Sequence, residues 1–142
     1  MTDERGNLHA LLEAGADALG ATIQQTDAGG TRMRVPLDES RAQTVRITLD
    51  DDTLRFTTRC GEAVLARDNP SLHRALLAKN ATLKHGFFAL AADGGIELVS
   101  TQLLATCDLE EFCTALANLA AVGDYLEQQL AKGLPGGNLD LY

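Results

Sequence analysis

Residues 44–59 read TVRITLDDDTLRFTTR, and this stretch decides the fold class. Apolar and polar residues alternate on both sides of the three aspartates Asp50–Asp52. Alternation is typical of a half-buried strand, because successive side chains point to opposite faces of a sheet. The aspartates supply a polar turn between two such strands. The stretch therefore predicts an antiparallel hairpin with one face on a hydrophobic core.

Further strands extend this hairpin into a larger sheet. Residues 32–37 alternate in the same way, which predicts a three-stranded antiparallel meander. Apolar runs at 83–91 and 95–101 flank an Asp-Gly turn, which is among the strongest hairpin signals. The run at 83–91 is apolar on both faces. We therefore expect that strand to be central in the sheet or buried against another subunit.

Three helices complete the predicted fold. The first spans residues 3–19, the second begins after the N-cap Asn69 and ends near Lys79, and the longest begins at Asp108. The fold class is α+β, a five-stranded, mainly antiparallel sheet flanked by three helices in the order α-β-β-β-α-β-β-α. We expect a single domain over residues 1–133 and a flexible C-terminal tail over 134–142.

Composition and charge narrow the classes of function. The 142 residues are 45% hydrophobic and carry a net charge of −8. This composition is typical of a soluble protein with a single hydrophobic core. An acidic domain repels phosphate backbones, so we expect no direct nucleic-acid binding. The sequence shows neither a basic-then-apolar leader nor an apolar run of membrane length. We therefore expect a cytoplasmic protein that does not bind membranes.

Catalytic and metal-binding motifs are absent from the sequence. It contains no Gly-x-Ser-x-Gly elbow, no phosphate-binding loop and no His-Glu-x-x-His repeat. Cys60, Cys107 and Cys113 lack metal-site spacing and are interpreted as reduced structural thiols. A Cys60–His73 catalytic pair and a calcium site at Asp50–Asp52 are the alternatives. We expect no enzyme activity, no cofactor and no metal.

One face of the predicted meander is rich in arginine. Five arginines occupy the polar positions of their strands, namely Arg32, Arg34, Arg46, Arg55 and Arg59. The simplest interpretation is a solvated face with cross-strand pairs. The functional interpretation is a client-binding surface for an acidic peptide, because the planar guanidinium can hold a carboxylate through two hydrogen bonds.

The sequence also contains more apolar surface than one narrow core requires. The second helix is apolar around more than one stripe, and the adjacent residues Phe87 and Phe88 face opposite sides of their strand. Such a surplus either fills the core or meets a partner or a second copy. We predict a dimer interface at Leu72, Leu76 and Phe88.

The second half of the chain carries a more specific pattern. Residues 80–90 read NATLKHGFFAL, residues 93–99 read DGGIELV, and a long helix from Leu109 to Leu130 follows, with Asp124-Tyr125 near its end. This pattern resembles the YbjN-like family, which shares the fold of the class I type III secretion chaperones. The resemblance implies a small cytoplasmic homodimer that binds and regulates or stabilises a client protein without a cofactor. Some YbjN-like proteins are linked to stress response.

A small-ligand sensory domain is the alternative from a different class of function. Its ligand would lie between the sheet and a helix, in contact with Phe56, Phe87 and Leu116. The chaperone-like hypothesis and the sensory-domain hypothesis both predict a binding protein, but they place the binding site in different parts of the domain.

Overall fold

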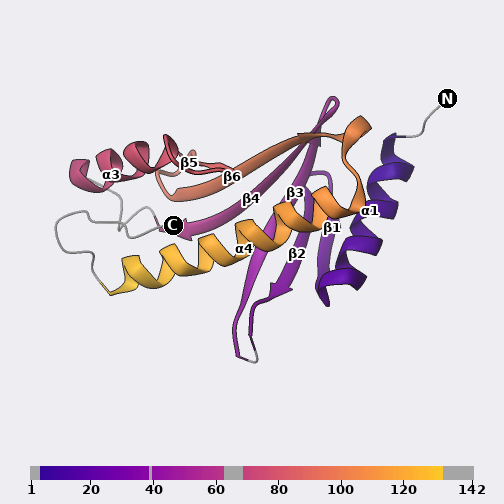
Figure 1. Ribbon diagram of the computed structural model, residues 1–142, viewed down its shortest axis with the longest axis horizontal. Helices are drawn as coiled ribbons and strands as arrows, with labels where there is room; N and C mark the ends of the chain where they lie inside the picture. Colours follow the sequence, from indigo (N-terminus) through magenta and orange to yellow (C-terminus); the bar gives the residue numbers. More distant parts are fainter. Residues whose placement is uncertain (1–3, 39, 63–68, 133–142) are drawn as a thin grey trace.

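The computed structural model describes residues 4–38, 40–62 and 69–132. Its elements in chain order are α1 (Glu4–Leu19), β1 (Thr22–Asp27), β2 (Gly30–Pro36), β3 (Ala42–Asp50), β4 (Thr53–Gly61), α3 (Pro70–Asn80), β5 (Phe87–Leu90), β6 (Ile96–Leu103), the 3-10 helix η1 (Leu104–Thr106) and α4 (Leu109–Ala131). The strands form one antiparallel sheet in the order β1-β2-β3-β4-β6-β5 (Figure 1). The α+β class and the meander of β2, β3 and β4 are as predicted.

The sheet has six strands, so the predicted number of five was wrong. The additional strand is β1, whose six residues are all exposed. It pairs with β2 across the turn that follows Asp27 and lies at one edge of the sheet. Because neither face of β1 is buried, its sequence lacks the alternation that reveals a half-buried strand. Pairing with β2 supplies its backbone hydrogen bonds instead.

The strand β5 lies at the opposite edge and is shorter than the predicted run at 83–91. A central position for it is wrong, because β6 separates β5 from β4. Phe88 is opposite Leu98 in the register and Phe87 is opposite Val99, so the two rings face opposite sides of the sheet as predicted. Burial of this strand against another subunit stays a prediction.

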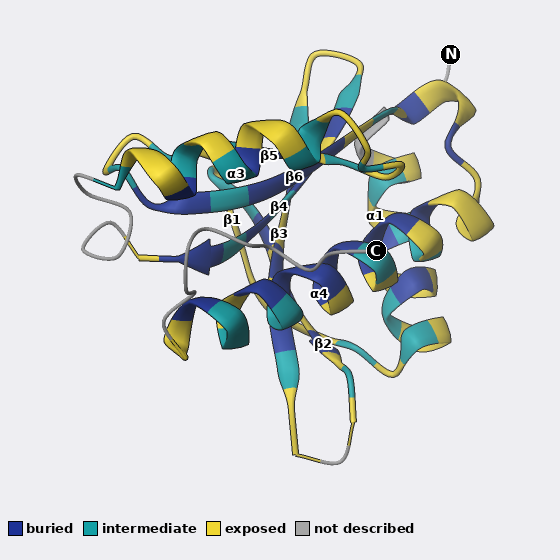
Figure 2. Ribbon diagram, turned by 60° about the vertical axis from the view of Figure 1, so that its left-hand side comes forward, coloured by how far each residue is buried: buried dark blue, intermediate teal, exposed yellow. Residues whose placement is uncertain are grey.

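The helices α1 and α4 cover the apolar face of the sheet. The long helix α4 contacts β3, β4 and β6, while α1 contacts α4 and β2 (Figure 1). Figure 2 shows buried residues along α4 and the central strands. Phe56, Phe112 and Leu116 are fully buried there, and the two phenyl rings meet edge-on with centroids 5.4 Å apart. The arginines of β2, β3 and β4 therefore occupy the other face, whereas the polar residues Thr31, Gln43 and Thr58 are buried on the core face.

Close packing of α4 depends on glycine at two contacts. A Cβ atom on Gly15 of α1 would lie 2.6 Å from the Phe112 ring, and one on Gly123 of α4 would lie 2.6 Å from Thr58 Cγ2. Thr58 is itself fixed, because its hydroxyl donates to the Thr44 carbonyl at 2.8 Å and accepts from the buried Gln43 amide at 2.9 Å. Gly15, unfavourable within a helix, is thus explained by helix contact.

Both predicted helix N-caps are confirmed. The side chain of Asn69 accepts a hydrogen bond from the backbone of Leu72, and that of Asp108 accepts one from the backbone of Glu111. The tail predicted at 134–142 lies outside the described residues. Among the helices of the described ranges, none has the length and apolar character needed to span a bilayer.

We predict that Gly123→Ala destabilises the fold, although alanine favours helix, because the new methyl group meets Thr58 Cγ2. The expected loss is about 1–3 kcal/mol, as in other overpacked cores, measured by urea unfolding. Thr58→Ser removes the obstructing methyl group and keeps the hydroxyl. The double variant should therefore lose less stability than the sum of the two single variants. Simple additivity would show that the contact does not matter.

Candidate functional site

The arginine face is the outer face of β2, β3 and β4, opposite α1 and α4. Met33, Val45 and Phe56 point into the core from these strands and are fully buried. The structure places all five predicted arginines at the alternating outer positions, with Arg59 half-buried and the others exposed: Arg32, Arg34, Arg46, Arg55 and Arg59. Their role in client binding stays a prediction.

Two of these arginines bind other parts of the chain. Arg46 donates through Nε to the carbonyl of Gly29 at 2.8 Å and so holds the turn between β1 and β2. Arg59 forms ion pairs with Asp93 at 2.5 Å and with Glu62 at 3.4 Å. The hydrogen bond from Arg59 lowers the pKa of the Asp93 carboxyl, and the same contact raises the pKa of Arg59. The charge of Arg59 is therefore compensated.

The remaining three, Arg32, Arg34 and Arg55, make no hydrogen bond or ion pair within the part of the chain that the structure describes. Arg32 also lies directly opposite Arg46 in the register of β2 and β3. Like charges at opposite positions of a sheet disfavour one another. The arginine face thus carries positive charge that no acid among the described residues compensates.

A groove between α3 and β5 forms a second candidate surface, which we call the α3–β5 groove. It has a volume of about 310 Å³, and its lining includes Leu76, Leu77, Phe88 and Leu90. Leu77 and Leu90 are 70% and 55% exposed, whereas the predicted interface residues Leu72, Leu76 and Phe88 are buried within the chain. The two exposed leucines are therefore the largest apolar side chains that this surface offers for a contact.

One residue at the free edge of β5, beside this groove, already has its backbone hydrogen bonds satisfied by a side chain. The side chain of Asn80 accepts a hydrogen bond from the Phe88 N–H at 2.6 Å and donates to the Phe88 carbonyl at 3.1 Å. Asn80 thus takes the place that a neighbouring strand would otherwise fill, which is one way to protect an edge strand. A strand added at this edge could therefore not bond the Phe88 backbone unless Asn80 moved.

A third surface, the α1 groove, lies between α1 and the turn that joins β1 to β2. Its volume is about 780 Å³, and its apolar lining includes Leu8 and Leu12 of α1 together with Ile47 and Leu49 of β3. Sequence reasoning missed this groove. Its walls come from segments far apart in the chain, and no local pattern indicates that they meet.

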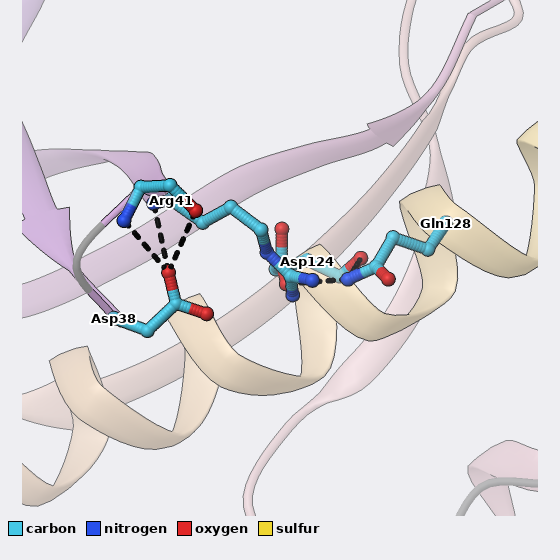
Figure 3. A network of polar contacts seen from close by, with 5 residues as sticks. Asp38, Arg41, Asp124 and Gln128 are labelled. Atoms are coloured by element: carbon cyan, nitrogen blue, oxygen red, sulfur yellow. Dashed lines mark hydrogen bonds and ion pairs between the residues drawn. The ribbon is translucent and has the colours of Figure 1, made fainter.

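An ion pair fixes the connection between β2 and β3 to α4 (Figure 3). Arg41 pairs with Asp124 of α4, and Gln128 donates to the same Asp124 oxygen at 2.8 Å. Asp38 shapes the loop by accepting hydrogen bonds from the backbone of Ser40 and Arg41. The Ser40 bond is the main cause that lowers the Asp38 pKa. The sequence pattern includes Asp124 but does not reveal its partner, which lies 83 residues away in the chain.

The cysteines do not form a nucleophilic site in this arrangement. Burial raises the pKa of the Cys60 thiol to about 12, and Cys60 donates to the carbonyl of Ile96. Burial likewise raises the pKa of Cys107 to about 11 and also raises that of Cys113. His73 lies on α3 beside the α3–β5 groove. Among the described residues, no group of three or more His, Cys, Asp and Glu is placed to hold a metal.

The three residues proposed for a small ligand do not line one space. Phe56 and Leu116 are fully buried in the core beneath α4. Phe87 lies on the opposite face, since it pairs with Val99, which in turn pairs with Thr57. A sheet–helix pocket built from these three side chains is therefore not formed.

The backbone of the whole domain is similar to that of several solved proteins. A chain of the ExsC–ExsE complex has a TM-score of 0.63 and 21% identity, covering 96% of this chain and 100% of that one. The Yersinia pestis type III secretion chaperone SycH, in complex with a fragment of YscM2, has a TM-score of 0.54 and 21% identity, covering 82% and 97%. YbjN from E. coli has a TM-score of 0.56 and 18% identity, covering 89% and 96%. The chain has the secretion-chaperone fold.

This likeness confirms the fold that the sequence pattern of residues 80–130 predicted. At these identities the likeness concerns the fold alone. No protein-family model and no curated protein sequence matches the chain. The secretion-chaperone fold is therefore recognisable through its backbone rather than through overall sequence similarity.

We predict a measurable coupling between Arg41 and Asp124. A double-mutant cycle with Arg41→Ala and Asp124→Ala should give a coupling energy of about 1 kcal/mol in unfolding experiments, because Asp124 is largely shielded from solvent. The exposed pair His9–Glu13 serves as a matched control, with an expected coupling below about 0.5 kcal/mol. Equal coupling energies for the two pairs would contradict the inference that the Arg41–Asp124 pair fixes the β2–β3 connection to α4.

We also predict that Cys60 and Cys107 resist Ellman's reagent in the native protein. In a Cys113→Ser variant at pH 8, a thiol pKa of about 12 or 11 leaves at most about one molecule in a thousand as thiolate. Both thiols should react only after unfolding in urea. Rapid reaction of the folded variant would show that a reactive cysteine exists.

Proposed function

We propose that this protein is a non-enzymatic, chaperone-like homodimer that binds a client protein and regulates or stabilises it. The observation that carries the proposal is the fold, shared over most of the chain with proteins solved in chaperone–partner complexes. The HopA1–SchA pair is one such chaperone–effector complex. Roles in stress response and a cytoplasmic location, implied by the sequence resemblance and composition, stay predictions.

Self-association is proposed at the α3–β5 groove. Leu77 and Leu90 expose apolar area that two copies could bury together across a two-fold axis. Leu72, Leu76 and Phe88 lie buried in the same region and would support this surface from inside each protomer. Since Asn80 already bonds the Phe88 backbone, the contact would use side chains rather than strand pairing at that residue.

Client binding is proposed at the α1 groove and the arginine face. The α1 groove offers apolar walls for the anchoring side chains of a client segment. The arginine face offers guanidinium groups for polar or acidic client residues, with Arg32, Arg34, Arg46, Arg55 and Arg59 as the candidates. A groove with both apolar and polar walls, together with a charged face, suits recognition of an unfolded segment without any chemical step.

The homodimer is tested by light scattering on the purified chain. We expect a dimer, and we expect Leu77→Asp with Leu90→Asp to give a folded monomer, because two buried carboxylates would be left unpaired. Leu103→Asp is the matched control, since Leu103 is 52% exposed but lies at the end of β6. A wild-type monomer, or equal disruption by the control, would refute this interface.

Client binding is tested by co-purification from lysate of the source cells, with the captured protein identified by mass spectrometry. The captured protein is then expressed with and without the chain. A client that becomes soluble or protease-resistant only in the presence of the chain supports the proposal. A chain that stabilises no captured protein, but whose melting temperature rises with a small metabolite, would favour the ligand-binding alternative.

A further inference from the structure

The arginine face stands out because its charge opposes that of the whole chain. The protein carries 20 acidic residues against 12 lysines and arginines. Nevertheless, Arg32, Arg34 and Arg55 have no hydrogen-bond or ion-pair partner anywhere in the described ranges. Within the described residues, Arg46 bonds only to the neutral carbonyl of Gly29, which leaves its charge in place. Four positive charges thus share the outer surface of three adjacent strands.

This arrangement is unfavourable for the isolated protein. Arg32 and Arg46 face one another in adjacent strands, where like charges repel. On the same face, Arg59 is compensated by Asp93 and Glu62. The contrast is that acids pair with one arginine of this face, whereas none of the described acids pairs with the other four. An anionic partner would relieve this repulsion.

We propose that the arginine face binds an extended acidic segment of a partner protein, with carboxylates at every second residue. Residues that share a face of a strand repeat at about 6.6–6.8 Å, so such a segment lying along β2 matches the repeat of Arg32 and Arg34. Each guanidinium can then hold a carboxylate through two parallel hydrogen bonds. The inference rests on the proposed client-binding function and adds the chemistry of the client.

The surroundings of these arginines favour an acidic peptide over a nucleic acid. Thr44, Thr48 and Thr57 lie opposite Arg34, Arg55 and Arg46 in the strand register and provide further hydrogen-bonding groups. The outer positions of β2, β3 and β4 hold no aromatic side chain on which a base could stack. The net charge of −8 also repels a long phosphate backbone while a short peptide stays within the positive area.

The test measures fluorescence anisotropy of a labelled peptide of alternating glutamate and threonine, added to the full chain. We expect binding that weakens with added salt, and no binding of the matching glutamine–threonine peptide. Arg32→Glu with Arg34→Glu should reduce affinity by about tenfold or more, since two charge pairs become repulsive. The control is Arg74→Glu with Lys84→Glu, an equal change in net charge at exposed positions elsewhere.

Each outcome decides the inference separately from the proposed function. Loss of peptide binding in the arginine variant alone supports the acidic segment. Equal loss in both variants, or equal binding of the glutamine peptide, overturns it, even if a client still co-purifies and is stabilised. Tighter binding of an oligothymidylate than of the acidic peptide overturns it in favour of nucleic acid. If the reversed variant fails to fold by circular dichroism, Arg32→Gln with Arg34→Gln replaces it.

Discussion

The rest of the structure depends on the contact between α4 and the sheet. Gly123 lets the helix approach Thr58 closely, and Phe112 meets Phe56 edge-on in the same layer. Apolar side chains dominate this layer on β3 and β4, in which the buried polar side chains Gln43 and Thr58 bond to each other. Because two successive residues of a strand point to opposite faces, covering one face leaves the charged residues on the other. The arginine face is the direct consequence.

The two edges of the sheet are treated differently. At β5, the Asn80 side chain forms hydrogen bonds with the backbone N–H and C=O of Phe88. The nearby side chains of Leu77 and Leu90 are exposed and form an apolar surface. At β1, all six residues are exposed, and five of them have polar side chains. The β5 edge thus presents apolar side chains, whereas the β1 edge presents mainly polar ones. A binding protein with two kinds of partner would need two such surfaces.

Sequence reasoning succeeded where one local pattern had one physical meaning. Alternation in residues 44–59 predicted both strands and the outward position of Arg46 and Arg55, and the caps Asn69 and Asp108 marked their helices correctly. It failed for β1, because a strand exposed on both faces shows no alternation. It did not decide between a central and a subunit-covered position for β5, because a run that is apolar on both faces does not reveal whether its cover is sheet, helix or subunit.

The sequence by itself determined the α+β class, the face on which each residue of β2, β3 and β4 lies, and the absence of recognisable catalytic motifs. These properties follow from periodicity and residue type, which are local. Only the tertiary structure decided which arginines are compensated, since Arg59 meets Asp93 and Arg41 meets Asp124 across long separations in the chain. Strand order and grooves were likewise decided there, because they depend on which distant segments pack together, and periodicity carries no information about that.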